Sequence, residues 1–301
     1  MIDRSSGHAT DDSSRTDVLS TIFDHEPGHF MSKLTRTLLV PLVALCFAGL
    51  FTTSAVQAQS VDVGGTLASR YVWRGTDFGN AAAIQPSLSF SQGGFTIGAW
   101  GSFALSPGTG ATEVTDSQGD ITGVTAVPES GVNENDLYAS YTFDTGGSGS
   151  VSVFVTDFYF STPGADFFDY DGDTGSHVIE PGVSYSGPES LPISLHASIN
   201  AYGRGAVDGN EIWLEASYPF SVNEVDLSIA VGGTPNDNAT DEGASGNYYG
   251  TDADTDAGIT KLSLSASKSI EITDEFSLPI SASYYINPYT PRSYFIFGIS
   301  L

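Results

Sequence analysis

The sequence predicts an all-β protein: a transmembrane, antiparallel, up-and-down β-barrel of about 12 strands that follows a signal peptide. Three observations lead to this fold class. Short segments alternate between apolar and polar residues, as strands with one apolar face do. Their connections alternate between short turns and mostly longer loops, an asymmetry typical of outer-membrane barrels. After residue 58, no apolar run approaches the roughly 20 residues that a spanning helix needs.

The composition excludes one class of partner and argues against an ordinary cytosolic enzyme. The 301 residues include 10 Lys and Arg against 36 Asp and Glu, which gives a net charge of -26. Nucleic acid is not expected to bind, because phosphate recognition needs a basic patch. Charged residues make up only 15% of the chain, whereas about 25% is usual in soluble domains.

Residues 31–58 predict a secretory signal peptide. A basic stretch, an apolar stretch and a small-residue cleavage site follow one another at 31–36, 38–51 and 56–58. We therefore expect the mature protein to begin at Gln59 and to form one barrel domain over 59–301. Residues 1–30 are polar, and we interpret them either as a genuine extension or as a start codon assigned too early.

Cys46, the only cysteine, lies inside the apolar part of the signal peptide. Its removal with the signal would leave a cysteine-free mature chain. Such a chain has no disulfide, thiol nucleophile or cysteine-ligated metal.

The first strand is expected over 61–75. Odd positions from 61 to 67 are apolar or glycine and face one side, while the even positions face the other. Tyr71 and Trp73 continue the apolar face, where we expect them at a membrane interface. Arg70 and Arg74 are then predicted on the opposite face, in the lumen.

Eleven further segments are predicted as strands, and the last is expected to close against the first. Nine of them alternate, 151–160 is apolar on both faces, and 178–185 is interrupted by Pro181. The segments are 84–91, 95–105, 136–143, 151–160, 178–185, 193–200, 211–218, 225–231, 261–267, 278–287 and 295–301.

The connections fall into two sets. The short set is 93–94, 145–149, 187–192, 220–223 and 273–276, and the mostly longer set is 76–83, 106–133, 162–176, 205–210, 234–258 and 288–292. In an outer-membrane barrel the short set would be periplasmic, and both chain ends would lie on that side.

The charged and polar residues predicted on the lumen face are candidates for lining a pore. They are Arg70, Arg74, Asp136, His196, Glu211, Glu215, Asp226, Lys261 and Lys268. In a channel they would set ion selectivity, whereas in a closed barrel they would pair and fill the lumen. About twelve strands leave more lumen than eight, which favours a channel; the bulk of Trp100, Trp213 and Tyr138 favours filling.

The two arginines have their own alternatives. They would form a local cation-repelling spot within an acidic mouth, or each would pair with a carboxylate such as Glu211 or Asp136.

Two acidic clusters suggest weak divalent-cation sites as a further class of partner. One is 169–173 with Glu180, and the other is Asp252, Asp254 and Asp256. In the first, a glycine stands at the fourth position of a calcium-loop pattern instead of the sixth. We therefore favour the interpretation of both clusters as solvated acidic surface.

No catalytic or cofactor site is predicted. His196 lies near Ser194 and Ser198, but residues two apart on one strand are not expected to form a nucleophile–base hydrogen bond. We interpret His196 as polar lining of the lumen, and we expect no enzyme activity.

The motif Ser-Arg-Tyr-Val-Trp-Arg-Gly at 69–75, with 76–80 and 84–88, resembles the opening of the TorF-type putative porins of Gram-negative bacteria. The resemblance is strongest over 60–105 and extends as architecture to 301. It implies a barrel in the cell outer membrane and a channel, with outer-membrane lipid and the barrel assembly machinery as partners. The chain departs from the usual aromatic last residue by ending in Leu301.

The expected function is therefore passive diffusion of ions or small solutes through an outer-membrane porin-like channel. The alternative is a non-conducting outer-membrane barrel with a structural or adhesion role through its acidic loops.

Overall fold

The computed structural model describes residues 59–78, 80–106, 108–115, 121–129, 133–161, 164–172, 175–203, 211–235, 248–249 and 257–301, with the backbone alone over 108–115 and 121–129. The predicted extension and signal peptide lie outside this part of the chain. Within it, no helix is long and apolar enough to cross a membrane.

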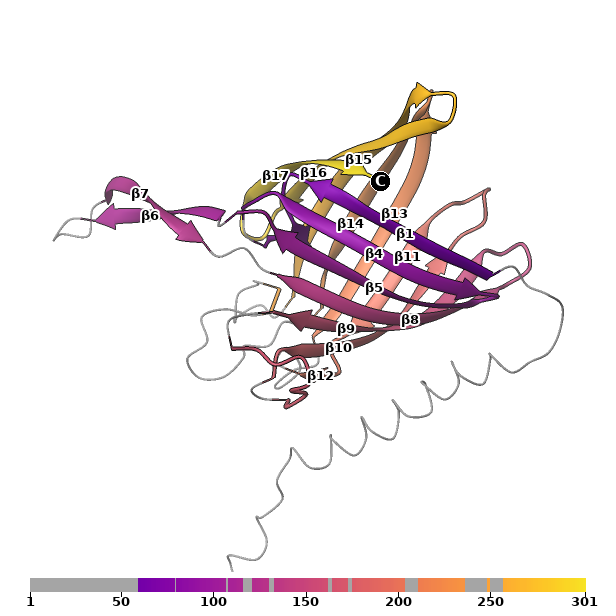
Figure 1. Ribbon diagram of the computed structural model, residues 1–301, viewed down its shortest axis with the longest axis horizontal. Coiled ribbons are helices and arrows are strands. Elements are labelled where there is room, and N and C mark those ends of the chain that lie inside the picture. The colour runs from indigo at the N-terminus through magenta and orange to yellow at the C-terminus, as the bar shows by residue number, and fades with distance from the viewer. Residues whose placement is uncertain are drawn as a thin grey trace, which may run out of the picture. The chain divides into compact units, whose positions relative to one another are not determined.

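One antiparallel sheet forms a closed barrel (Figure 1). Its strands are β1 (Gln59–Ala68), β4 (Ala83–Gln92), β5 (Phe95–Ala104), β8 (Glu134–Asp144), β9 (Ser150–Phe160), β10 (His177–Ser186), β11 (Ser194–Ile199), β12 (Tyr202–Gly203), β13 (Ile212–Val222), β14 (Val225–Thr234), β15 (Gly258–Thr273), β16 (Phe276–Asn287) and β17 (Arg292–Ser300). β11 and β12 pair with successive parts of β10 and together form one strand of the wall. The 13 strands of the sheet therefore make a 12-stranded, up-and-down barrel, as predicted.

The last strand returns to the first. β17 pairs with β1 at Thr66↔Ser300, Leu67↔Ile299 and Ala68↔Gly298. β10 and β11 pair over Gly182↔Ser198 to Ser186↔Ser194, which joins the two halves of the sheet. The predicted closure of the last strand against the first is therefore confirmed.

The period-2 pattern gives the wall two different faces. Outward side chains are large, apolar and exposed: Val63 is 77% exposed, Leu88 51% and Phe297 56%. Inward positions carry polar, small or aromatic residues, and the hydroxyls of the facing pair Ser265 and Ser283 are bonded at 3.0 Å. An apolar outside around a polar inside is the reverse of a water-soluble globule.

The connections differ in length between the two ends of the barrel. At the end that we call the turn end, β4 and β5 are joined by a turn with Gly93 at φ 63, and β13 and β14 by one with Asn223 at φ 55. Left-handed backbone at glycine or asparagine is typical of tight hairpins. The opposite, loop end carries the mostly longer set of connections.

The structure corrects two of the predicted segments, the first strand and the 106–133 connection. β1 ends at Ala68 instead of 75, and the chain leaves the wall to form a short hairpin of β2 (Val72–Trp73) and β3 (Thr76–Asp77). The 106–133 connection is not only a loop, because it contains β6 (Gly108–Thr115) and β7 (Ile121–Glu129), which pair with each other.

Candidate functional site

Residues 69–78, which we call the strap, fold into the lumen at the loop end of the barrel. Arg74 and Gly75 form the tip of the β2–β3 hairpin with φ values of 49 and 87. These left-handed conformations reverse the chain and are incompatible with a continued strand. The predicted strand therefore cannot run through residues 74 and 75.

The wall holds the strap tip by its backbone. Thr260 Oγ1 donates to the Arg74 carbonyl at 3.0 Å, and Asn287 Nδ2 donates to the Gly75 carbonyl at 3.2 Å. A Cβ on Gly75 would lie 1.8 Å from the Thr260 carbonyl oxygen, so no other residue fits there.

A β-bulge places Thr260 in this position. The register between β14 and β15 shifts between Gly232 and Gly233, which pair with Lys261 and Ile259 and leave Thr260 as the extra residue. Thr260 is fully buried. Bulges commonly re-aim a side chain next to a functional site.

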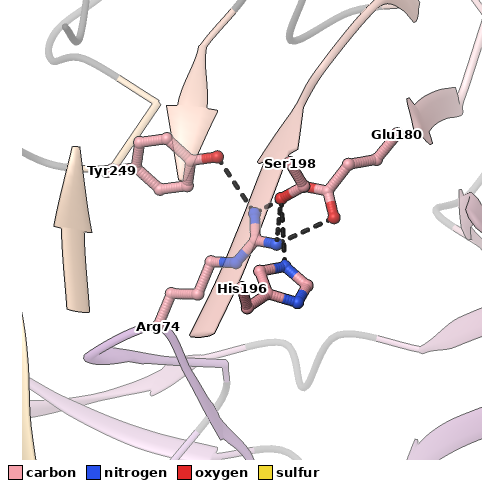
Figure 2. A network of polar contacts seen from close by, with 5 residues as sticks. All are labelled: Arg74, Glu180, His196, Ser198 and Tyr249. Carbon is pink, nitrogen blue, oxygen red and sulfur yellow. Dashed lines mark hydrogen bonds and ion pairs between the residues drawn. The ribbon is translucent and has the colours of Figure 1, made fainter. Parts of the chain in front are cut away.

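The Arg74 side chain crosses to the opposite wall (Figure 2). Its guanidinium forms a bidentate ion pair with Glu180 of β10, with Nη1–Oε2 at 2.6 Å and Nη2–Oε1 at 2.8 Å. It also donates to Ser198 Oγ at 3.1 Å and to the Tyr249 hydroxyl at 3.0 Å. Arg74 is 9% exposed and Glu180 2%, so water has little access to this charge-assisted, bidentate pair.

Aromatic rings surround the same guanidinium. Its carbon lies 4.3 Å from the ring centroid of Trp73 and 5.1 Å from that of Trp213. The Trp213 indole covers Gly232 on the neighbouring strand β14, which has no side chain: a Cβ there would be 2.4 Å from the indole. The rings favour the cation by cation–π attraction.

The base of the strap packs on the remaining wall. The Tyr71 hydroxyl donates to Glu134 of β8, and its ring lies 5.5 Å from that of Trp100 on β5. Trp73 contacts Phe158 of β9 at a centroid distance of 5.8 Å. The predicted interfacial position of Tyr71 and Trp73 is therefore wrong: both lie inside, because the strap carries them there.

A cavity of about 300 Å³ lies in the lumen beside the strap. It is lined by Val72, Trp73, Arg74, His196, Trp213, Glu215, Lys261 and Tyr285. Across it, Lys261 Nζ donates to both carboxylate oxygens of Glu215 at 2.9 Å. The lumen at this level therefore contains a charged pair and aromatic faces.

The structure separates the nine residues predicted to line a lumen into three groups. Arg74, Asp136, His196, Glu211, Glu215 and Lys261 lie on the inward side in the half of the barrel that holds the strap. Asp226 and Lys268 lie near the turn end, but the prediction for Lys268 is wrong: it pairs in register with Ile280 on the outward, apolar face, and its ammonium bonds to the exposed Glu224. Arg70 belongs to the strap, beyond the end of β1, and pairs with another strap residue, Asp77, at 2.9 Å.

Neither arginine takes its predicted partner. Asp136 is buried beside Glu134 on β8, and Glu211 is buried just before β13. The partner of Arg74 is instead Glu180, which the sequence places only in a loose calcium-loop pattern. The one signal that could have identified Glu180 is the alternation along β10, which turns its side chain toward the lumen.

The expectation for His196 is wrong in one detail. Its Nε2 lies 3.2 Å from Ser198 Oγ, so two residues that are two apart on one strand do form a hydrogen bond (Figure 2). Ser198 is 4% exposed and also accepts a hydrogen bond from Arg74. This serine is therefore part of the Arg74 network.

The acidic clusters are only partly described. Asp169 and Asp171 lie in turns, with the Asp171 amide bonded to Asp169 Oδ1 at 3.0 Å. The other aspartates named for these clusters lie outside the described residues. Among the residues that the structure does describe, no group of three or more His, Cys, Asp or Glu side chains could hold a metal ion.

No protein-family model matches the chain, and no curated protein matches it in sequence. The resemblance to TorF-type porins therefore stays a prediction.

Proposed function

We propose that this protein is an outer-membrane channel for ions or small solutes, with the strap as the constriction of its lumen. The loop end then faces outward and the turn end faces the periplasm. Membership of the TorF-type porins, insertion by the barrel assembly machinery and the absence of enzyme activity belong to the same proposal. We also expect that its acidic loops bind divalent cations weakly or not at all.

The observation that carries the proposal is the distribution of polarity. Outward side chains form an apolar belt that would be costly in water and suits lipid. A closed barrel leaves no unpaired edge in that lipid. Inward positions carry charged and hydroxyl side chains around a cavity, which a solute path needs.

The strap supports a restricted channel over a wide one. It contacts strands on all sides of the lumen and is fixed by backbone hydrogen bonds at its tip and by a buried ion pair. The β2–β3 hairpin is a two-stranded sheet of its own and adds no strand to the barrel sheet. Movement of the hairpin would therefore leave the strand pairs of the barrel intact.

Conductance of the refolded protein in planar bilayers tests the proposal. We expect small, discrete openings of the wild-type protein, and larger ones when Glu180→Gln releases the strap. Membrane fractionation should recover the protein with the outer membrane.

The second candidate is the non-conducting barrel, and the filled strap region favours it. If neither the wild type nor the released variant conducts, while both are folded, the structural or adhesion role replaces the channel.

A further inference from the structure

We propose that the cavity beside the strap binds a neutral, hydroxyl-rich solute of about monosaccharide size. The inference deepens the proposed function and rests on it, because it names the class of solute that would occupy the lumen. Two observations support it. The charged side chains that line the cavity are paired with one another, and aromatic and polar side chains make up the rest of the lining.

The charges of the cavity wall are neutralised in pairs. Glu215 on β13 and Lys261 on β15 both pair in register with Gly232 on β14, and their side chains meet over this glycine. Glu215 is 23% exposed and Lys261 16%, so the pair borders the cavity. Arg74 is matched by the bidentate carboxylate of Glu180.

Paired charges discriminate against ionic ligands. A small anion drawn to Lys261 would lie beside the Glu215 carboxylate, and a cation drawn to Glu215 would lie beside the ammonium. A zwitterion would have to break this pair to use it. A neutral solute has no such cost and can bond to both members, because a hydroxyl donates to a carboxylate and accepts from an ammonium.

The other lining groups suit the two kinds of surface on a sugar ring. Trp73 and Tyr285 line the cavity, and aromatic rings supply apolar surface for the C–H side of a sugar. His196, whose Nε2 is bonded to Ser198, and Tyr285 also bring polar atoms to the cavity lining. The Lys261 ammonium lies 5.7 Å from the centroid of the Tyr285 ring, so aromatic and charged groups stand side by side.

The volume limits the size of the solute. About 300 Å³ is at the lower end of small-molecule sites, which span about 300–1,000 Å³. A monosaccharide or small polyol is therefore favoured over an oligosaccharide.

Tryptophan fluorescence of the refolded protein in detergent micelles tests this inference. Two of the three tryptophans, Trp73 and Trp213, line the cavity. We expect a saturable change with D-glucose, and none with glycine, sodium acetate or choline chloride at matched ionic strength. Tyr285→Leu should weaken glucose binding about tenfold, the loss of about 1.4 kcal/mol.

The matched control is Tyr218→Leu, the same change at an outward, exposed tyrosine on β13. It should leave the glucose affinity unchanged. A gel-mobility comparison of heated and unheated samples establishes that both variants are folded. If Tyr285→Leu does not fold, the wild-type comparison among the four probes still decides the solute class.

The outcomes separate this inference from the channel. A saturable change with glycine, acetate or choline, or with none of the four probes, overturns the neutral-solute site. Conductance without glucose binding overturns the site and leaves the channel. Glucose binding without conductance supports the site and overturns the channel.

Discussion

Replacing Glu180 with glutamine should release the strap while the barrel stays folded. The change keeps the shape of the side chain but leaves the Arg74 charge buried without its counter-ion. The pair is bidentate and nearly inaccessible to water, at 8% and 2% side-chain exposure. The wall does not depend on it, since the β2–β3 hairpin that carries Arg74 adds no strand to the barrel sheet.

The size of the effect follows from the burial of the pair. Removing one partner of a buried ion pair costs about 3–5 kcal/mol. At the lower figure, the ratio of docked to released strap falls by roughly 150-fold. The Thr260 and Asn287 hydrogen bonds remain, so the variant should populate a released strap without losing the fold.

Tryptophan emission measures this release. Trp73 belongs to the strap, Trp213 lies under Arg74, and Trp100 contacts Tyr71, so every tryptophan of the chain reports on docking. We expect red-shifted emission and stronger acrylamide quenching in Glu180→Gln. The matched control is Glu224→Gln, which breaks the exposed Lys268–Glu224 pair and should change neither.

A second variant tests the electrostatic reasoning. Arg74→Met combined with Glu180→Gln removes both charges, so its cost should be clearly smaller than the sum of the two single changes. Unchanged emission in Glu180→Gln, or strictly additive costs, would refute the claim that this ion pair holds the strap.

Three further predictions follow from the wall, the cavity and one loop. Phe297→Arg should reduce folding into lipid vesicles far more than Ser300→Arg, because a charge near the bilayer midplane costs about 2–4 kcal/mol; equal yields would invert the assigned faces. Lys261→Gln leaves Glu215 unpaired and should raise the cation preference of the reversal potential in asymmetric KCl, and an unchanged potential would remove the pair from the ion path. Burial and the hydrogen bond from Tyr170 to Asp157 raise the pKa of Tyr170 to about 12. Its contribution to loop docking is therefore complete below about pH 10, the usual tyrosine pKa, and is lost as pH rises through about 12; Tyr170→Phe should remove this late step from the 295 nm absorbance titration.

The wall could be predicted because it depends on local information. Side chains of a strand alternate with a period of two, so 61–67 and 295–301 show their apolar faces without knowledge of their neighbours. Turn residues such as Gly93 mark the hairpins for the same reason. Closure then follows, because an open sheet edge is not tolerated in lipid.

The strap could not be predicted because its anchors are distant in sequence. Residues 69–77 continue the aromatic and polar alternation, and only Gly75 indicates a turn. Glu180 lies 106 residues from Arg74, and Thr260 points inward only because of a bulge. Both contacts depend on the curvature of the closed barrel, which alternation alone does not specify.

The most direct test of the account is the unitary conductance of a variant in which a short Gly-Ser linker replaces residues 72–77. The matched control replaces 108–129, the β6–β7 hairpin, which pairs only with itself. If the strap constricts a polar lumen, the first variant conducts more than the wild type and the control conducts the same. Equal conductance in all three folded proteins, or none in any, would contradict the account.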